Sequence, residues 1–259
     1  MLDGKKGLIV GIANEMSIAW GCARVFKREG ADLAITYLND KAEPHVRPLA
    51  DEIDASIILP LDVRNEQQCD MLFAQIEKQW GKLDFLLHSI AFAPADDLHG
   101  RVVDCSRDGF LAAMDISCHS FTRLAKRAEP LMRDGGALLT VTYMGSERVI
   151  DHYGVMGPVK AALESTTRYM AAELGPKNIR CHAISPGPLL TRAASGIAEF
   201  LHLMDETAQR APSQRLVTID EIGELAAFLA SDRSRSLTGD VVHIDGGYNI
   251  MGYGRLSGF

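Results

Sequence analysis

Two residues of the stretch DHYGVMGPVKAALES, at 151–165, have side chains that could act together on a bound molecule: Tyr153 and Lys160. A phenol stays protonated at neutral pH and can donate a hydrogen bond, and a neighbouring ammonium lowers its pKa and strengthens that donation. Because seven residues make almost two turns of α-helix, a helix here would project both side chains from nearly the same face. The alternative is a surface tyrosine and a surface lysine that never meet.

The residues between the two fit the start of a helix. Gly154 and Gly157 allow backbone to come close to a ligand. Pro158 is tolerated in a first helical turn, because its missing N–H would have no helical partner there. The helix is therefore predicted to begin near residue 156, which puts Tyr153 just before it and makes the shared face approximate.

The composition is that of a globular protein with a sizeable core: 259 residues, 47% hydrophobic and 24% charged. A net charge of −7 without a basic run argues against nucleic acid or an anionic membrane as a partner. No stretch has the pattern of a signal peptide or a transmembrane helix, so a cytoplasmic protein is expected. The five cysteines form no CxxC pair and the histidines have no HxxxH spacing, which favours reduced thiols and no metal site.

Short apolar runs alternate with amphipathic helical segments along the whole chain. Strands that are apolar throughout and separated by helices predict a parallel sheet covered on both faces. With right-handed crossovers this is an α/β fold, a Rossmann-like doubly wound sheet of about seven strands, in a single domain over 1–259. Gly30, Gly81 and Gly175 each follow a helical run and are predicted C-terminal caps. The predicted strands are 7–11, 32–37, 56–62, 84–89, 137–142, 179–185 and 241–245.

Two segments interrupt the alternation, a loop at 94–106 and a longer insertion at about 186–212. Both follow strands, and ligands of open α/β sheets bind beyond the carboxyl ends of the strands. The two segments are therefore candidates for a substrate-binding lid.

The first strand leads into GIANEMSIAWG, residues 11–21, which could bind a diphosphate. Gly11 permits a tight turn, Ser17 could cap the following helix and offer its hydroxyl to phosphate, and the helix N-terminus presents free N–H groups. The alternative is an ordinary strand–turn–helix corner with a serine cap.

The end of the second strand bears on the choice of nicotinamide cofactor. An acidic residue there would bind the adenosine ribose, but this chain has Leu38, with Lys41 nearby and no arginine for a 2′-phosphate. NADH is therefore favoured over NADPH. Asp62, after the third strand, could accept from the adenine amino group or could cap the helix that begins near Asn65.

At this point the chain resembles the short-chain dehydrogenase/reductases, and within them the NADH-dependent enoyl-acyl-carrier-protein reductases of bacterial fatty-acid synthesis. The resemblance rests on GIANEMSIAWG, LHSIAFAP at 87–94, TYMGSERVIDHYGVMGPVKAALES at 142–165, HAISPGPLLTRAASGI at 182–197 and GDVVHIDGGYNIMG. These span almost the whole chain. A typical short-chain reductase has Tyr-x3-Lys, whereas the enoyl reductases have Tyr-x6-Lys and a second tyrosine, which here is Tyr143.

The resemblance implies roles for the two side chains first considered. Lys160 would hydrogen-bond the nicotinamide ribose, and Tyr153 would donate to the thioester carbonyl oxygen. Hydride would pass to the β-carbon of the trans-2-enoyl thioester, and the enolate charge would be met by Tyr153 as an oxyanion donor. The reaction would be the last step of the fatty-acid elongation cycle.

The resemblance also implies further site residues, one position at a time. For Ile90 and Leu189 the alternative is core packing, and Tyr143 could be a half-buried aromatic rather than a substrate contact. The implied cofactor-binding residues are Gly11, Ser17, Ile18, Leu38, Asp62, Val63, Ser89, Ile90, Ala91, Lys160, Leu189 and Thr191, and the implied substrate-binding residues are Ala93, Tyr143 and Tyr153.

The implied partners are acyl carrier protein and further copies of the chain in a homotetramer. The tail 248–259 is suited to an interface, and the alternative is an ordinary flexible end. An acidic carrier needs a basic patch, but 193–206 has no Lys or Arg, which leaves Arg192, Arg210 and Arg215. The apolar part of this segment, GIAEFLHLMDE, is either a helix packed on the core or a flap over an acyl chain. Two rival functions stay open, a reductase of another substrate and a catalytically silent NAD-binding protein.

Overall fold

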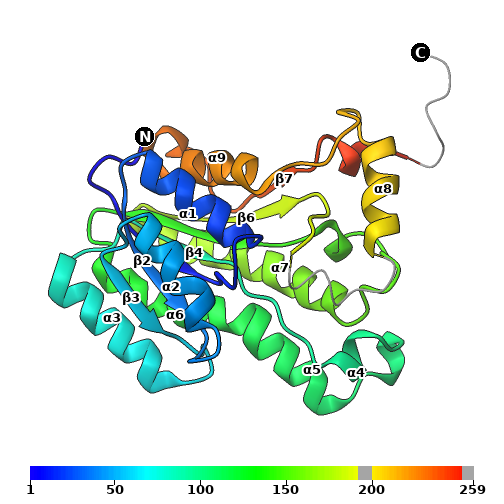
Figure 1. Ribbon diagram of the computed structural model, residues 1–259, viewed down its shortest axis with the longest axis horizontal. Helices are drawn as coiled ribbons and strands as arrows, with labels where there is room; N and C mark the ends of the chain where they lie inside the picture. Colours follow the sequence, from blue (N-terminus) through cyan, green and yellow to red (C-terminus); the bar gives the residue numbers. More distant parts are fainter. Residues whose placement is uncertain (192–199, 253–259) are drawn as a thin grey trace.

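The protein is built on a seven-stranded, wholly parallel sheet, seen in a computed structural model that describes residues 1–191 and 200–252 (Figure 1). The strand order is β3-β2-β1-β4-β5-β6-β7. Strands are added toward one edge from β1 to β3 and toward the other edge from β4 to β7, so the topological switch point lies between β1 and β4. This confirms the predicted doubly wound sheet, and each strand lies within two residues of its predicted ends. The strands are β1 (Lys6–Val10), β2 (Asp32–Tyr37), β3 (Ile57–Pro60), β4 (Phe85–His88), β5 (Gly136–Val141), β6 (Ile179–Pro186) and β7 (Val241–Ile244).

Helices cover both faces of the sheet and bury two apolar cores against it. One face carries α1 (Ile18–Arg28), α2 (Glu43–Glu52) and α9 (Ile219–Ala230). The other carries α3 (Glu66–Trp80), α5 (Arg107–Met114), α6 (Ser120–Ala128) and α7 (Met156–Leu174). A π-helical turn, η2 (Asp115–His119), joins α5 to α6. The short helices are α4 (Ala95–Leu98), η1 (Val102–Asp104), η3 (Glu129–Leu131), η4 (Met144–Ser146), η5 (Gly175–Lys177), η7 (Asp232–Ser234) and η8 (Tyr248–Ile250).

The crossover from β6 to β7 departs from the predicted right-handed rule. The steps β4–β5, β5–β6 and β6–β7 run in one direction along the sheet, yet α9 packs on the face opposite to α6 and α7. The last connection therefore has the opposite hand. The long segment after β6, which includes α8 (Phe200–Arg210), lets the chain pass to the far face before α9 begins.

The first and last long helices, α1 and α9, cross in direct backbone contact (Figure 1). A Cβ on Gly21 would overlap the carbonyl of Ile219, and a Cβ on Gly223 would lie 2.8 Å from the carbonyl oxygen of Gly21. Glycine is the residue that permits this approach. The position of α1, whose N-terminus faces the site described below, is therefore set by a helix more than 190 residues later in the chain.

Three predicted details of the connections are corrected or refined. Gly30 and Gly81 end helices with positive φ, as expected, but Gly175 has φ −53° and opens η5. The left-handed residue that ends this run is Asn178, because the chain makes one more helical turn before it leaves α7. The predicted loop 94–106 contains α4 and η1, and the predicted insertion 186–212 contains α8, which stands at the edge of the molecule away from the sheet (Figure 1).

No helix within 1–191 and 200–252 combines the length and apolar character needed to cross a membrane.

Candidate functional site

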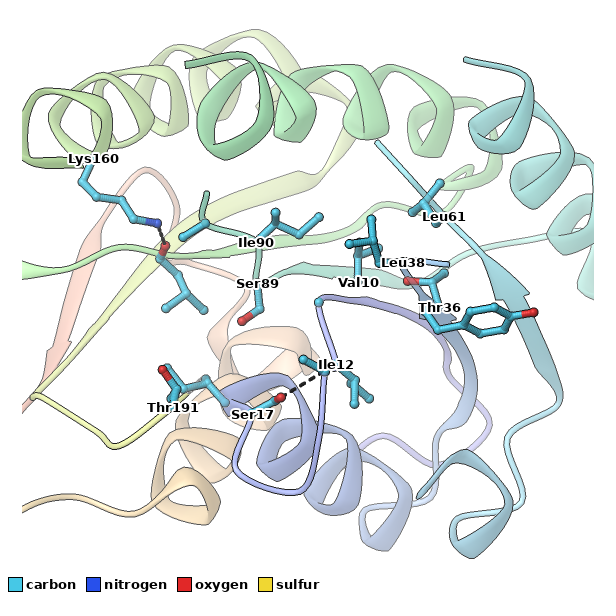
Figure 2. Close-up of a pocket in the computed structure, with 16 residues that line it drawn as sticks. Val10, Ile12, Ser17, Thr36, Leu38, Leu61, Ser89, Ile90, Lys160 and Thr191 are labelled. Carbon is cyan, nitrogen blue, oxygen red and sulfur yellow. Dashed lines mark hydrogen bonds between the residues drawn. The ribbon is translucent and has the colours of Figure 1, made fainter. Parts of the chain in front are cut away.

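Two adjoining cavities lie at the carboxyl ends of the central strands, near the point between β1 and β4 where the strand order reverses. The first, about 370 Å³, runs from the ends of β1 and β2 to α7, and Figure 2 shows Leu38, Thr36 and Leu61 at one end and Lys160 at the other. The second, about 280 Å³, lies beyond Lys160 and has a mostly apolar lining. The residues common to both cavities are Ile18, Ala91, Val141, Lys160 and Thr191. The two cavities therefore share part of their walls, and Lys160 lies at their junction.

The glycine turn at the floor of the first cavity is built as the sequence predicted, although Ser17 acts differently. Gly11 has φ +117°, and a Cβ there would overlap the carbonyl oxygen of Ser89, so only glycine fits. The Ser17 hydroxyl makes no capping bond to α1. It accepts instead from the backbone N–H groups of Ala13 (3.0 Å) and Asn14 (3.1 Å), so it braces the turn that leads into the helix. Gly11, Ser17 and Ile18 all line the cavity.

The far end of this cavity is formed by β2 and the residue after β3. Leu38 lines it and is 53% exposed. Leu61, rather than Asp62 or Val63, provides the wall from β3. Neither Thr36 nor Leu61 was predicted, because a residue that contributes an apolar or backbone surface has no motif of its own.

Asp62 does not cap α3, so that alternative is wrong. Its carboxylate accepts from the backbone N–H of Arg64 (3.0 Å) and pairs with the guanidinium of the same residue (2.6 Å), which lowers the pKa of Asp62. The cap of α3 is Asn65, whose side chain accepts from the backbone of Gln68. Val63 is buried in the core.

The remaining predicted cofactor and substrate residues divide between the two cavities. Ser89 and Ile90 line the first, and Ala93 and Leu189 line the second. Ile90 and Leu189 each pack against a core cluster as well. Both residues therefore line a cavity and also contribute to core packing. Ala91 and Thr191 lie where the cavities join.

Lys160 is buried at the junction, one turn into α7, with 4% of its surface exposed. Its Nζ donates to the carbonyl oxygen of Val141 at the end of β5, at 2.7 Å (Figure 2). Burial lowers the pKa of Lys160 to about 8, and the nearby Cys118 and Glu164 oppose that fall. The ammonium is thus held with its charge facing a cavity rather than bulk water.

Tyr143 and Tyr153 form an edge-to-face pair in the wall of the second cavity, with ring centroids 5.1 Å apart. Tyr153 directly precedes the helix that carries Lys160, as predicted, and α7 begins at Met156. A Cβ on Gly145 would overlap the Tyr153 ring, so the backbone of the Tyr143 segment holds that ring in place. The buried Tyr143 hydroxyl has no hydrogen-bond partner within the described part of the chain. It is therefore free to donate to a molecule in the cavity.

The expected lowering of the phenol pKa by Lys160 is wrong. Burial raises the pKa of both Tyr143 and Tyr153, and the negative charge of Glu164 adds to the rise at Tyr153. Desolvation outweighs the ammonium because a phenolate in this apolar wall would lose its hydration. Both phenols are consequently kept protonated, and each can act as a donor.

Glu164 was missed by sequence reasoning. It follows Lys160 by one helical turn, a spacing that puts the two side chains on neighbouring positions of one face and could have drawn attention to it. The structure buries it against the hydroxyl groups of Thr142 and Ser146, with 5% of its surface exposed.

The three arginines that were candidates for a basic patch lie only partly within the described residues, and the two that are described are each paired with a glutamate. Arg210 pairs with Glu206 at 2.9 Å, and Arg215 pairs with Glu221. Arg192 and Ile197 lie outside the described residues, as does the tail from residue 253. In α8, Leu201 is 65% exposed, and neither it nor the partly buried Leu203 and Met204 belongs to a core cluster, which argues against the core-packed alternative.

The chain is similar over nearly its whole length to proteins of one kind. Residues 11–249 match a family model described as enoyl-(acyl carrier protein) reductase. A curated relative from Rhizobium meliloti, named enoyl-acyl-carrier-protein reductase (NADH) 1, is 46% identical over 97% of this chain and 93% of its own. A solved enoyl-(acyl-carrier-protein) reductase from Anaplasma phagocytophilum in complex with NAD is 44% identical, with a TM-score of 0.94 over 97% of this chain and 96% of its own. A third, from Bacillus cereus with NADP+ and an indole naphthyridinone, is 44% identical, with a TM-score of 0.95 over 97% and 99%.

Proposed function

Because the chain belongs to the enoyl-(acyl carrier protein) reductase family, we propose that it uses NADH to reduce the trans-2 double bond of enoyl thioesters carried by acyl carrier protein. This is the last step of fatty-acid elongation. The observation that carries the proposal is Lys160 at the junction of two cavities, with Tyr143 and Tyr153 in the wall of the second. One space suits a dinucleotide and the other an apolar acyl chain that meets it.

The first cavity has the features that a dinucleotide requires. The turn at Gly11 would hold the diphosphate at the N-terminus of α1. Only glycine fits at position 11, and the Ser17 hydroxyl braces the turn. Lys160 would hold the nicotinamide ribose, and Leu38 would lie against the adenosine. When bound, NADH supplies the hydride that adds to the β-carbon of the substrate.

The tyrosine pair would meet the charge that then builds on the thioester oxygen. Tyr153, next to the helix of Lys160, is the proposed donor to that oxygen, and Tyr143 borders the same pocket with its unpartnered hydroxyl. Their raised pKa values keep both phenols protonated, and a buried donor stabilises an oxyanion more than an exposed one does. The apolar lining of the second cavity suits an acyl chain.

The adenosine end of the first cavity supports NADH rather than NADPH. Among the described residues that line this end, Thr36, Tyr37, Leu38 and Leu61, none is cationic. The nearby Arg64 is already paired with Asp62. A 2′-phosphate would therefore have no charged partner among these lining residues.

We also propose that the protein works as a homotetramer in the cytoplasm, with acyl carrier protein as its delivery partner. Large apolar side chains exposed on α7 and near the C-terminus support contacts between copies: Tyr169 is 70% exposed and Ile250 is 75% exposed. Light scattering on the purified protein would test this assembly. A monomer at micromolar concentration would contradict it.

The reaction is tested by loss of NADH absorbance in the presence of trans-2-enoyl thioesters, comparing wild type with Tyr153→Phe. Removing one oxyanion donor is expected to lower kcat about 10²–10³-fold. Ser56→Ala removes an exposed hydroxyl just before the start of β3, at the end of the sheet opposite the cavities, and is the control that should leave the rate unchanged. If NADH binds but no enoyl thioester promotes its oxidation, the proposed activity is wrong, and ketone substrates would be screened next.

A further inference from the structure

Glu164 is a buried carboxylate that the proposed reaction does not use directly. Its Oε1 accepts from the hydroxyl of Thr142 at 2.6 Å and from that of Ser146 at 2.5 Å. Across residues 1–191 and 200–252 it forms no ion pair with a Lys or Arg side chain. A carboxylate removed from water is costly unless it is hydrogen-bonded or faces a cation, and here the two hydroxyl groups provide the hydrogen bonds.

The two hydroxyl groups that bind Glu164 flank Tyr143. Thr142 and Ser146 belong to the segment 142–146, which follows β5, carries Tyr143 and includes the glycine that packs on the Tyr153 ring. One turn earlier on α7, Lys160 donates to the carbonyl oxygen of Val141, the last residue of β5, which directly precedes this segment. Side chains of α7 therefore make three hydrogen bonds to the end of β5 and the segment after it: two through Glu164 and one through Lys160.

The charges around Lys160 leave Glu164 as its main counter-charge. The titratable groups that interact with the ammonium are Cys118 from η2, His88 from β4 and Glu164 from α7 itself, and Tyr153 lines the second cavity together with Lys160. Burial raises the pKa values of Cys118 and Tyr153 and lowers that of His88 to about 3, so all three are neutral near pH 7. Among these described groups only the carboxylate carries a negative charge.

We propose that Glu164 is a positioning residue for the reduction: it fastens the Tyr143 segment to α7, and its charge keeps the Lys160 ammonium ionised at the junction of the two cavities. This inference deepens the proposed function and rests on it for the role of Lys160. It separates two contributions of one side chain, a mechanical one through Thr142 and Ser146 and an electrostatic one toward Lys160.

Two variants separate these contributions. Glu164→Gln keeps a carbonyl oxygen that can accept both hydroxyl bonds but removes the charge. Ser146→Ala removes one hydroxyl bond and keeps the charge. Glu173→Gln, an exposed glutamate on the same helix, is the matched control.

The first readout is NADH affinity as a function of pH, followed by the fluorescence of the bound nucleotide without substrate. Affinity is expected to fall as Lys160 loses its proton, and in Glu164→Gln the midpoint of that fall should lie about one pH unit lower than in wild type. Ser146→Ala and Glu173→Gln should keep the wild-type midpoint. An unchanged midpoint in a folded Glu164→Gln protein would overturn the electrostatic part.

The second readout is the split between kcat and KM with an enoyl thioester. Ser146→Ala is expected to lower kcat about tenfold with little change in the KM for NADH, because a donor displaced by a fraction of an ångström loses much of its effect. An unchanged kcat in this variant would overturn the mechanical part, even if Glu164→Gln failed to fold. If wild type oxidised no NADH with any thioester while the midpoint shift appeared, the proposed activity would fail and the electrostatic coupling of Glu164 to Lys160 would stand.

Discussion

Lys160→Met is expected to make the nucleotide-free protein more stable while it removes NADH binding. The ammonium is buried to 4% exposure in an apolar junction, and its pKa falls from an ordinary 10.5 to about 8. Methionine has a similar length and no charge, so it can occupy the same space without the desolvation penalty.

The size of the effect follows from that fall in pKa. A fall of about 2.5 units corresponds to about 3 kcal/mol of destabilisation by the charged form at neutral pH. The variant also loses the bond from Nζ to the Val141 carbonyl, which costs about 1 kcal/mol. The net expectation is a gain of about 2 kcal/mol in the free energy of unfolding.

The assay is urea-induced unfolding of both nucleotide-free proteins at several pH values. Between about pH 8 and pH 10.5 the unfolded wild-type chain binds more protons at this lysine than the folded chain does. The free energy of unfolding of wild type therefore rises with pH in that window, and the advantage of the variant shrinks. Other alkaline groups are shared by both proteins and cancel in the difference. A variant no more stable than wild type at neutral pH, or an advantage that stays constant up to pH 10.5, would refute this reasoning.

Three further changes have expected outcomes. Gly11→Ala would force a Cβ into the Ser89 carbonyl at φ +117°, so NADH affinity should fall at least about tenfold and the protein should lose about 1–3 kcal/mol of stability, measured by nucleotide titration and urea unfolding. Leu38→Arg would add a cation at the adenosine end of the first cavity, so the ratio of kcat/KM for NADPH over NADH should rise about tenfold, and an unchanged ratio would place the adenosine elsewhere. Thr218→Ala would break the capping box with Glu221 at the start of α9, so thermal unfolding should report a loss of about 1 kcal/mol without any change in kcat.

The strands and the reactive helix could be predicted because their signals are local. The run 32–37, for example, is buried from Leu33 to Tyr37 and forms β2 at the predicted residues. The glycines and proline after Tyr153 set the start of α7 at Met156, and that brought Lys160 to the junction of the cavities. In each case a few consecutive residues are enough to determine where the strand or helix begins.

The errors occurred where a contact depends on distant or competing partners. Ser17 braces a turn that precedes it because the loop folds back over the hydroxyl, a conformation with no sequence signature. The carboxylate of Asp62 binds Arg64, two residues away, and Asn65 caps the helix instead. Glu164, which sequence reasoning missed, meets Thr142 only because the end of β5 reaches α7 in the folded sheet.

The predicted pKa direction for Tyr153 failed for the same reason, since the extent of burial is a property of the whole fold. Desolvation in the wall of the second cavity outweighs any ammonium nearby.

The backbone contact between α1 and α9 also constrains how the protein is made. During synthesis α1 emerges from the ribosome early, but the helix that Gly21 packs against ends only at Ala230. Until then the apolar face of α1 lacks this partner, and the nucleotide turn before it lacks its support. The packing that fixes α1, and with it the turn that precedes α1, therefore forms only after the chain has been made through α9.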